Sequence, residues 1–554
     1  MLWIALHLPA LALESWAATL GDARAGRPLA LLQDHAVALI DAAAAARGLK
    51  PGMKRATALA LAPDLLWAQA DPRRDAQALR AVVHAALAFS PSVAWATPAE
   101  WRPPGRPLPS HLDSADSADD LPPNPAPSPA LVGVRLEVQS CLRYFGGLRR
   151  LLQRLRDDLA LLGHQVRIAS APTALGAALL AAWRSDLAIG AHSHDLTALQ
   201  PLLAAVPLHL LGPGQQHWQA LQGMGLSTLA DLHGLPRSGL ARRFSPELLD
   251  DIDRACGSSP DAQRWLSLAP RFDSRIELFT RADSHAQILA GADILLPRLL
   301  AWARARQTRV AAFELVMHHE PRHRHNHSQD SDTPAHTSLH VAPAQASAEL
   351  AHLRSLLAER LGRLPLAAPA LELSLHCDAT QAGGAPNGEL FISQASQREG
   401  LARLVERLQA RLGREHVLRL SAVADHRPER ATRWQPADPA DVLTRTGDAG
   451  SQSDQAHTLP SQPLWLLPQP QALHERHQRP LLDGRPLQLL AGPERMETGW
   501  WDASTPALRD YFIAQAASGA LVWVYRHRLP GADVDDSGGS AETGSGWYLQ
   551  GLFA

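Results

Sequence analysis

The sequence predicts an α+β protein with several domains, and three observations support this class. Apolar runs typical of buried strands alternate with helical segments over residues 1–199. Residues 200–268 read as entirely helical, and residues 272–425 again mix strands with long helices. This order is typical of helices that pack against one sheet. A chain of 554 residues is too long for a single hydrophobic core, so roughly three to five domains are expected.

The composition is that of a globular cytoplasmic protein. Hydrophobic residues make up 46% of the chain and charged residues 19%, and a net charge of −2 gives no overall attraction to nucleic acid or membrane. The three cysteines lie far apart without a CxxC pair, which indicates neither disulfides nor a metal site. Residues 2–13 are apolar, but no basic region precedes them and Pro9 interrupts them, unlike a signal peptide. We expect no cofactor.

The first 199 residues predict strands and helices in turn. The opening stretch WIALHLPALALE reads as a buried strand followed by a turn and a helix. Residues 98–130 are rich in Pro, Ser and Asp and are predicted to be a disordered insertion. The remaining predicted helices are 35–48, 75–90, 147–163 and 173–185, and the remaining strands are 131–140 and 164–172.

The rest of the chain changes character three times. Residues 200–268 carry short helices punctuated by glycine, as in helix-hairpin-helix modules. The polar, proline-containing residues 426–462 are predicted to be a linker. In the mixed region we expect strands at 309–319 and 370–377 and helices at 348–362 and 397–413, and near the C-terminus strands at 519–529 and 546–554.

Several of these segments, in the same order along the chain, resemble the Y-family (translesion) DNA polymerases. APDLLWAQADPRRDAQALRAVVHAALAFSPSVAW resembles the passage from fingers to palm, and IASAPTALGAALLAAW resembles a palm strand and helix. LLGPGQQHWQALQGMGLSTLADL is similar to the thumb hairpin and its following helix. The alternative is that these are core strands of some other α+β protein.

The resemblance implies a domain layout. It implies a palm-like domain at 1–22 and 89–199, a fingers-like domain at 23–88, a thumb at 200–268 and a little-finger-like domain at 272–425. A linker with a clamp-binding peptide would follow at 426–470, and a small β-containing partner-binding region at 471–554.

The catalytic positions of the family carry neutral side chains here. The family holds two metal ions with acids in the patterns D-x-D-x-F-(F/Y)-A and S-x-D-E, and these acids fall on Ala5, His7, Gln139 and Ser140. The triphosphate contacts fall on Ala42, Ala45 and Ala174. Neutral side chains cannot compete with the hydration of two Mg²⁺ ions, so the resemblance implies a palm without catalysis.

A polymerase-like chain with an empty palm and a long C-terminal extension resembles the noncatalytic subunits of bacterial mutagenesis cassettes. The extension motifs are ERMETGWWD, RDYF and GWYLQGLFA. The resemblance implies a scaffold that brings an error-prone C-family DNA polymerase and a cassette partner to the sliding clamp at damaged DNA. Two alternatives stay open: an active polymerase that uses the displaced carboxylates Glu137 and Glu14, and a plain DNA-binding repair protein.

Modest, salt-sensitive DNA binding is expected from the thumb hairpin. Gly212 and Gly214 match the family's hairpin, where backbone N–H groups approach a phosphate closely. Charge adds little, because residues 272–425 hold 17 arginines and 17 acids. Four arginines of this region either contact DNA or lie on a solvated helix face: Arg298, Arg304, Arg306 and Arg309.

A candidate clamp-binding peptide lies in SQPLWLLPQP, at residues 461–470. Bacterial clamp ligands are extended peptides whose apolar ends fill a pocket. One register uses Gln462 with Leu464, Leu466 and Leu467, and another places Leu464 and Trp465 in the final apolar pair. Alternatively, Leu464 and Trp465 pack as the first strand of the C-terminal domain. LQGLF at 549–553 ranks second, because it reads better as a terminal strand.

A histidine-rich segment lies between the predicted strands of the mixed region. It spans residues 318–340, and alternating histidines can bind transition metals. No carboxylate or cysteine completes a fixed site, so adventitious metal affinity is the preferred interpretation.

Overall fold

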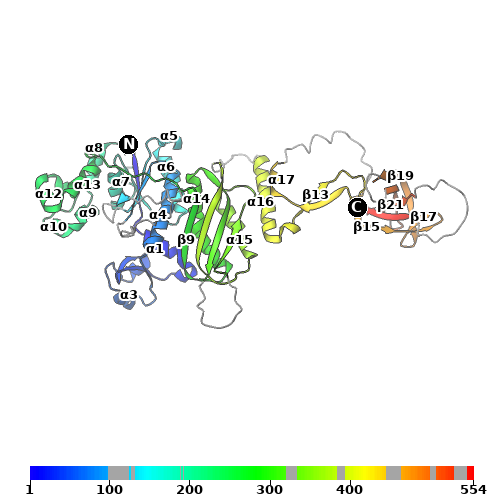
Figure 1. Ribbon diagram of the computed structural model, residues 1–554, viewed down its shortest axis with the longest axis horizontal. Coiled ribbons are helices and arrows are strands. Elements are labelled where there is room, and N and C mark those ends of the chain that lie inside the picture. The colour runs from blue at the N-terminus through cyan, green and yellow to red at the C-terminus, as the bar shows by residue number, and fades with distance from the viewer. Residues whose placement is uncertain are drawn as a thin grey trace, which may run out of the picture. The chain divides into compact units, whose positions relative to one another are not determined.

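A computed structural model describes residues 1–97, 124–125, 132–187, 189–190, 193–319, 334–383, 394–444, 463–499, 507–528 and 546–553. The chain divides into two compact units, Met1–Ile392 and Ser393–Ala554. Figure 1 labels the elements of both units, which mix helices and sheets and confirm the predicted α+β class. Of the predicted insertion at 98–130, only Asn124–Pro125 lies within the described residues.

The first sheet of the N-terminal unit has the strand order β6-β5-β7-β1-β8, and β1 lies antiparallel to both its neighbours. Alternate side chains of β1 enter different cores. Ile4 and Leu6 pack with α4 and α6, whereas Trp3 and Ala5 pack with α7. The strands are β1 (Trp3–His7), β5 (Val93–Thr97), β6 (Asn124–Pro125), β7 (Gly133–Glu137) and β8 (Arg167–Ala171), and the helices are α1 (Leu11–Ala17), η1 (Ala18–Arg24), α4 (Pro72–Leu87), α5 (Leu142–Phe145), α6 (Leu148–Ala160) and α7 (Ala174–Trp183).

A small three-stranded sheet is inserted between η1 and α4, and here the helical prediction for residues 35–48 is wrong for its first part. β3 (Ala36–Ile40) forms a hairpin with β2 (Leu29–Gln33), and β4 (Leu66–Gln69) runs parallel to β2. Asp34 and His35 adopt positive φ at the hairpin turn. Only the short helix α2 (Ala42–Ala46) follows β3, and α3 (Arg55–Leu61) comes later. A short apolar run such as AVALI does not distinguish strand from helix by composition.

Residues 196–256 form the predicted helical region. Its elements are α8 (Leu196–Ala204), η5 (Leu208–Leu210), α9 (Gly212–Gln216), α10 (Trp218–Gly223), α11 (Leu229–His233), α12 (Arg237–Phe244) and α13 (Pro246–Cys256). Residues 257–268 contain neither helix nor strand. This connector returns to the first sheet, where the Trp265 ring stacks on Trp3 with centroids 5.7 Å apart and Leu266 N–H donates to Val93 O at 2.9 Å.

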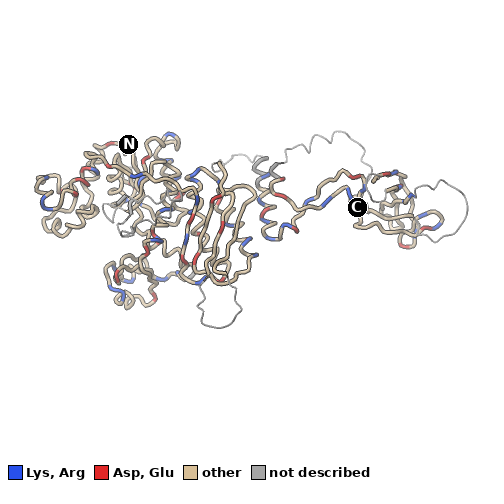
Figure 2. Tube along the Cα trace, in the orientation of Figure 1, with Lys and Arg blue, Asp and Glu red and all other residues tan. Residues whose placement is uncertain are grey.

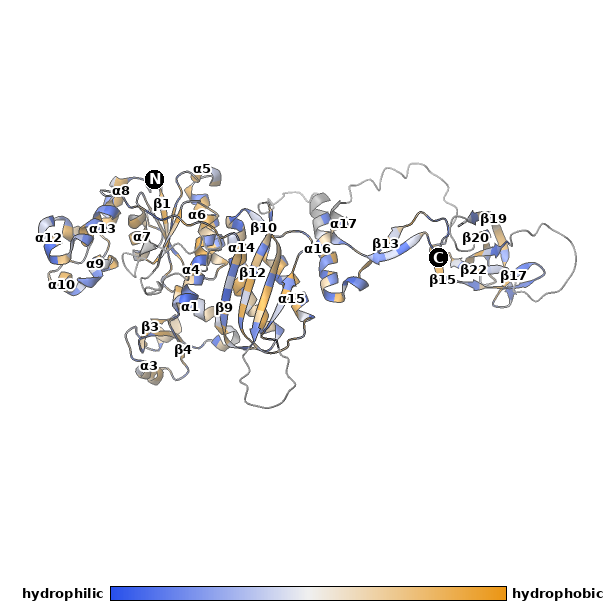
Figure 3. Cartoon of the chain, viewed as in Figure 1, coloured by the Kyte–Doolittle hydropathy of each residue, from blue (hydrophilic) through white to orange (hydrophobic). Residues whose placement is uncertain are grey.

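A four-stranded antiparallel sheet completes the N-terminal unit, in the order β11-β10-β12-β9, with apolar (orange) residues along its strands in Figure 3. Its elements are β9 (Phe272–Ala282), α14 (His285–Ala305), β10 (Thr308–His319), β11 (His336–Val341), α15 (Leu350–Gly362) and β12 (Ala370–Ala382). By length and composition α14 is apolar enough to cross a membrane. Its residues are mostly buried here, against the sheet and against α4, as in the core helix of a globular domain.

The C-terminal unit contains the helices α16 and α17, which the paired strands β13 and β14 separate along the chain. It also contains a five-stranded sheet of order β15-β22-β21-β20-β19. Two elements occur where the sequence predicted a linker: β14, which pairs with β13, and α17. The elements are α16 (Gln394–Leu412), η6 (Arg414–His416), β13 (Leu418–Ala422), β14 (Thr432–Pro436), α17 (Pro439–Thr444), β15 (Trp465–Ala472), β16 (His474–Arg476), β17 (Arg479–Leu482), β18 (Arg485–Pro486), β19 (Gln488–Thr498), β20 (Ala507–Gln515), β21 (Leu521–His527) and β22 (Trp547–Leu552).

Candidate functional site

The two predicted metal positions on β1 both lie opposite an arginine. The antiparallel register places Ala5 opposite Arg135 of β7 and His7 opposite Arg167 of β8. Directly opposed residues of antiparallel strands project from the same face of the sheet. The sheet face that carries Ala5 and His7 therefore also carries two guanidinium groups, which repel a metal cation.

His7 lies at the end of β1 and is itself unsuited to binding a hard cation. Its Nδ1 lies 3.3 Å from Val132 O. Burial lowers the pKa of His7, the hydrogen bond with Val132 O raises it, and the charge of Arg167 lowers it again, with a net decrease. The imidazole is therefore neutral at pH 7, and Mg²⁺ prefers oxygen ligands.

Gly133 occupies the position opposite His7 on β7, and the backbone there leaves no room for a side chain. A Cβ atom on Gly133 would lie 2.2 Å from Leu6 O. The corner at the end of β1 thus contains an imidazole, a glycine and a guanidinium group. These residues do not fit a site for two divalent metal ions.

Arg135 is buried beneath the connector that follows α13. Burial lowers its pKa, whereas the nearby carboxylate of Asp261 raises it. Asp261 also accepts hydrogen bonds from Leu175 N at 2.9 Å and Gln263 Nε2 at 2.8 Å. The connector therefore supplies the counter-charge that this buried arginine requires.

Gln139 and Ser140 do not lie beside Ala5 and His7, so the structure does not assemble the four predicted positions into one site. Glu137 lies opposite Trp3, and Val138 N–H donates to Leu2 O at 2.8 Å. Gln139 and Ser140 follow as exposed turn residues near the start of β1, at the far end from His7. Because β7 runs antiparallel to β1, residues that follow β7 lie beside the start of β1. The sequence motifs alone did not specify this register.

The displaced carboxylates of the alternative reading lie at opposite ends of β1. Glu137 Oε1 accepts hydrogen bonds from Leu2 N at 3.3 Å and Gln139 N at 3.0 Å. Glu14 lies beyond the His7 end, where its carboxylate accepts from Gln165 N at 3.1 Å and lies 3.4 Å from His164 Nδ1. The five residues of β1 span about 13 Å, so these two carboxylates do not meet at one metal ion.

The three predicted triphosphate positions are alanines on the helices α2 and α7. Ala42 and Ala45 are exposed on the short helix α2. Ala174 is buried at the first position of α7, where Thr173 Oγ1 accepts from Gly176 N and Asp261 accepts from Leu175 N. The Asp261 carboxylate thus accepts a backbone N–H group at the N-terminus of α7 and interacts favourably with the helix dipole.

The predicted DNA-binding glycines, Gly212 and Gly214, are both buried in α9. A Cβ atom on Gly214 would lie 2.0 Å from Leu208 O, so this glycine permits the close packing of the hairpin. The following Gln215 and Gln216 are exposed. Their role in phosphate contact stays a prediction.

The four candidate DNA-facing arginines are engaged within the protein to different degrees. Arg298 is buried, Arg304 Nη1 donates to Asp158 Oδ1 at 2.8 Å, and Arg306 Nη1 donates to Ala269 O at 3.1 Å. Arg309 lies beside Gly383. Figure 2 shows acidic and basic residues interspersed along the strands of the four-stranded sheet. This distribution gives that sheet no basic surface comparable to a phosphate-binding groove.

Trp465, Leu466 and Leu467 of the predicted clamp peptide begin the edge strand β15, Leu464 directly precedes it, and Gln462 lies outside the described residues. Trp465 and Leu466 pair with Leu552 and Gly551 of β22, yet their side chains point into solvent. Leu464 is 81% exposed, Trp465 69% and Leu466 41%. The segment forms the first strand of the sheet, as one interpretation expected, and it exposes adjacent apolar side chains; clamp binding by this segment stays a prediction.

Leu467 differs from its three neighbours, since it packs against the core of the C-terminal sheet. The register that inserts Leu466 and Leu467 into a partner would remove Leu467 from this core. The register that ends on Leu464 and Trp465 leaves the core intact. The second peptide, residues 549–553, lies mainly in the interior strand β22, with Leu549 and Gln550 buried, so it is the terminal strand that the sequence predicted.

The histidine-rich segment begins and ends inside strands, while residues 320–333 lie outside the described part of the chain. His318 Nε2 lies 2.8 Å from Ser374 Oγ, and His319 Nε2 lies 2.7 Å from Thr337 Oγ1. Within the described residues, no group of three or more His, Cys, Asp or Glu side chains is arranged to hold a metal ion. The three cysteines are free.

Sequence reasoning missed the two arginines opposite Ala5 and His7. The signal was present, because GVRLE and VRIASA each place one arginine in an otherwise apolar strand. Arg135 is buried, and a buried charge needs a partner and is a candidate for function, whereas Arg167 is exposed. The strand register needed to pair it with β1 was not available from the sequence.

Among solved structures, the chain shows a weak similarity to the chains that follow. The chain is similar to a ternary complex of Dbh, with a TM-score of 0.35 and 14% identity over 69% of this chain and 100% of that one. It is also similar to DinB from Sulfolobus solfataricus, with a TM-score of 0.34 and 14% identity over 68% of this chain and 98% of that one. No family model matches the sequence.

Among curated proteins, the chain is similar to the protein ImuB. The chain is 26% identical to ImuB of Caulobacter vibrioides strain NA1000 / CB15N over 527 residues, which cover 91% of this chain and all of that protein. The same values hold for ImuB of strain ATCC 19089 / CIP 103742 / CB 15. The predicted resemblance to a polymerase-like protein with a long C-terminal extension is thereby confirmed as similarity to ImuB.

Proposed function

We propose that this chain is a noncatalytic, Y-family polymerase-like scaffold in DNA damage tolerance and SOS mutagenesis. It would link the sliding clamp to an error-prone C-family DNA polymerase and an ImuA-like protein on cytoplasmic, nucleoid-associated DNA. The observation that carries the proposal is the pairing of Ala5 with Arg135 and of His7 with Arg167. Two-metal phosphoryl transfer needs anionic oxygens at such a corner, whereas these residues present positive charge.

Primer extension tests the absence of catalysis. The purified full-length chain, with Mg²⁺ and all four nucleotides, should extend no primer, while an active Y-family polymerase serves as the positive control. Activity that persists through two further purification steps, and that is lost in Glu137→Gln, would support the alternative of an active polymerase with displaced carboxylates. Activity that is unchanged in Glu137→Gln would point to a contaminating polymerase.

The clamp-binding proposal rests on the exposed apolar side chains of β15. A monomeric soluble protein seldom leaves adjacent large apolar side chains such as Leu464 and Trp465 in solvent, and such groups are typical of a partner-binding surface. β15 lies at the sheet edge, and only four of its residues pair with β22. Pro468 and Pro470 lack N–H donors, which further limits pairing.

A clamp pull-down distinguishes the registers. Leu464→Ala/Trp465→Ala should weaken clamp binding at least about tenfold, as expected when apolar anchors are removed. Gln471→Ala, on the same strand beyond the prolines, is the matched control and should bind like the unmodified chain. Undiminished binding of the double variant would rule out this peptide and direct attention to residues 549–553.

DNA binding is proposed to be modest and salt-sensitive. The mixed charges of the described surface allow few phosphate contacts, so affinity should fall only moderately between about 50 and 200 mM salt, with a shallow log–log slope. Fluorescence anisotropy with a labelled duplex measures this slope. Tight DNA binding without any clamp or polymerase contact would instead favour a plain DNA-binding repair protein.

The partner contacts are proposed to lie in residues 471–554. A truncation that ends near residue 460 removes the five-stranded sheet and the exposed residues of β15 together. It should lose the clamp, the C-family polymerase and the ImuA-like protein in pull-downs. Retention of all three partners by the truncated chain would contradict the assignment.

A further inference from the structure

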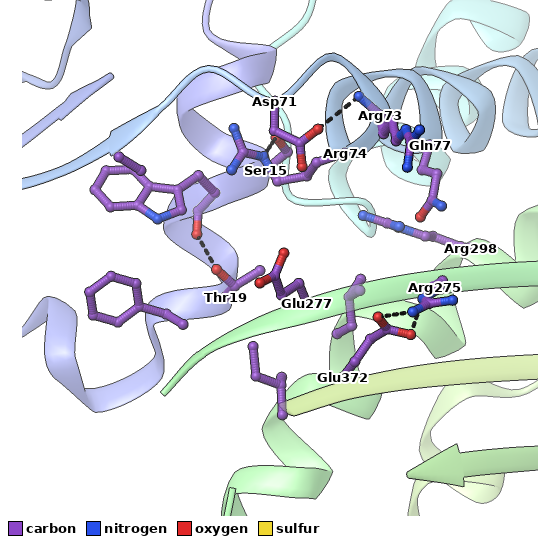
Figure 4. A pocket seen from close by; sticks show the side chains of 15 residues that line it. Ser15, Thr19, Asp71, Arg73, Arg74, Gln77, Arg275, Glu277, Arg298 and Glu372 are labelled. Atoms are coloured by element: carbon purple, nitrogen blue, oxygen red, sulfur yellow. Dashed lines mark hydrogen bonds and ion pairs between the residues drawn. The ribbon is translucent and has the colours of Figure 1, made fainter. Parts of the chain in front are cut away.

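A cavity of about 560 Å³ lies in the N-terminal unit, between the first sheet's helices and the four-stranded sheet. Figure 4 shows its labelled side chains, which come from α1, η1, α4, α14, β9 and β12. Its volume falls within the range of small-molecule sites, roughly 300–1,000 Å³. The cavity is separate from the end of β1, since neither His7, Gly133 nor Arg167 is among its lining residues.

The strongest feature of this cavity is a buried arginine without a carboxylate partner. Arg298 is only 5% exposed, and its one hydrogen bond among the described residues runs from Nη1 to the neutral Ser274 Oγ at 3.3 Å. Burial lowers the pKa of Arg298 to about 10, so the guanidinium stays charged at pH 7. A buried charge without a counter-ion is costly, and an anionic ligand would relieve this cost.

A second guanidinium lines the same cavity. Arg74 Nε donates to Ser15 Oγ at 3.2 Å and lies 3.4 Å from Asp75 Oδ1, while its buried Nη2 makes no hydrogen bond with the described residues. The lining also contains Arg73 of α4 and Arg275 of β9, and Arg275 is already paired with Glu372. Arg298 and Arg74 therefore retain donors for an oxyanion, and guanidinium groups bind phosphate through such charge-assisted bonds.

The remainder of the lining limits what can carry that phosphate. Trp16 and Phe279 form an edge-to-face pair with centroids 6.2 Å apart, which offers an aromatic wall. Asp71 and Glu277 add acceptors for hydrogen-bond donors of a ligand. These two carboxylates disfavour a bare multivalent anion and favour a molecule that combines a phosphate with a planar ring and N–H or O–H groups.

We propose that this cavity binds a phosphorylated small molecule with a planar ring, of the nucleoside monophosphate type, through Arg298 and Arg74. The phosphate lies between the two guanidinium groups, and the ring packs toward Trp16 and Phe279. This site is independent of the proposed scaffold function. It requires neither the clamp nor a catalytic palm.

Isothermal titration of the full-length chain with AMP tests the site. AMP should bind, adenosine should bind at least about tenfold more weakly because it lacks the phosphate, and inorganic phosphate should compete with AMP. Arg298→Met should weaken AMP binding about 10- to 100-fold, whereas Arg242→Met, an exposed arginine on α12, should leave it unchanged. Phe279→Ala should weaken AMP but not phosphate.

Circular dichroism and the thermal midpoint establish that Arg298→Met is folded. If it is not, Arg74→Met gives the same test from α4, with the same expected loss. Equal AMP affinity in the unmodified chain and in the folded arginine variant would overturn the proposal. Arg298-dependent binding of a single-stranded hexanucleotide, without binding of AMP or phosphate, would also overturn the proposal. The ligand of the cavity would then be a nucleic acid.

Discussion

Arg135 and Arg167 occupy the strand positions opposite Ala5 and His7, and this arrangement differs from the mere loss of acids. A polymerase palm with alanines alone would be neutral. Here each position also faces a fixed positive charge. The repulsion is reduced at Arg135 by the nearby Asp261 carboxylate and at Arg167 by exposure to solvent. Electrostatics nevertheless opposes metal binding at this corner.

Restoring acids at the corner is expected to fail at Gly133. Gly133→Asp should lower the free energy of unfolding by about 1–3 kcal/mol, because its Cβ would overlap Leu6 O. His7→Asp/Gly133→Asp should still show no primer extension. Urea denaturation of each variant measures the free energy of unfolding, and the single variant His7→Asp is the control. A Gly133→Asp protein as stable as the unmodified chain would contradict the close approach.

His84, buried on α4, should make the N-terminal unit sensitive to acid. Burial lowers the pKa of His84 from 6.5 to about 3, and the charge of Arg80 adds to this effect. The unfolded chain therefore binds the proton more tightly. This contribution to stability is complete above pH 6.5 and is lost as the pH falls toward 3. At pH 5 the loss is about 2 kcal/mol.

The variant His84→Leu tests this dependence. Its free energy of unfolding should fall about 2 kcal/mol less than that of the unmodified chain between pH 7 and pH 5. Urea denaturation at the two pH values measures the difference, and the exposed His233→Leu is the matched control. An unchanged pH dependence in His84→Leu would show that other groups cause the acid sensitivity.

At the scale of elements, the edge strand β15 combines two kinds of side chain on one short segment. Leu464, Trp465 and Leu466 are exposed, whereas Leu467 contributes to the core with Leu473, Leu487 and their neighbours. The prolines that follow interrupt pairing between Leu466 and Gln471. An edge strand with few pairs leaves backbone groups available to a partner strand or pocket.

Substitutions of these two kinds of side chain should have different effects on the stability of the C-terminal unit and on clamp binding. Leu467→Ala should destabilise the C-terminal unit by about 1–2 kcal/mol, because it removes a partly buried side chain from the sheet core. Leu464→Ala should change stability by less than about 0.5 kcal/mol. Hydrogen exchange of β21 and β22 amides reports both effects. Equal destabilisation by the two variants would mean that Leu464 also packs on the sheet.

The sequence predicted the long periodic elements better than the short ones. Helices α4, α6, α7 and α15 and strands β10 and β12 lie where the apolar pattern placed them, because many repeats of one period reinforce each other. Strands β2, β3 and β4 were missed, since each has only four or five residues and is specified by its partners. The same limit applied to Gln139 and Ser140, whose position depends on strand register.

At the scale of the whole molecule, the division at Ile392 and Ser393 falls inside the predicted little-finger-like range of 272–425. The four-stranded sheet with α14 and α15 belongs to the first unit, whereas α16, β13 and β14 belong to the second. Glu429, which follows β13, accepts hydrogen bonds from Arg509 of β20 and Gln550 of β22. The second unit therefore has its own polar network as well as its own core.

Two units with separate cores should unfold separately. Calorimetry of the full chain is expected to show two transitions, and a fragment of residues 1–392 should reproduce one of them. Arg509→Met, which breaks the pair with Glu429, should lower only the other transition. A single transition shifted as a whole by this variant would show that the units unfold together.

The arginines opposite β1 also bear on how such a chain can change over generations. A single acid introduced at Ala5 or His7 would form an ion pair with the arginine across the strand, so it would be retained as a structural contact and offer no free carboxylate. Building a two-metal site at this corner would require the arginine, the glycine at 133 and the acids to change together. Intermediates would carry an unpaired charge or a steric overlap. If the proposed noncatalytic function is right, stability would oppose a gain of catalysis before selection for activity could act.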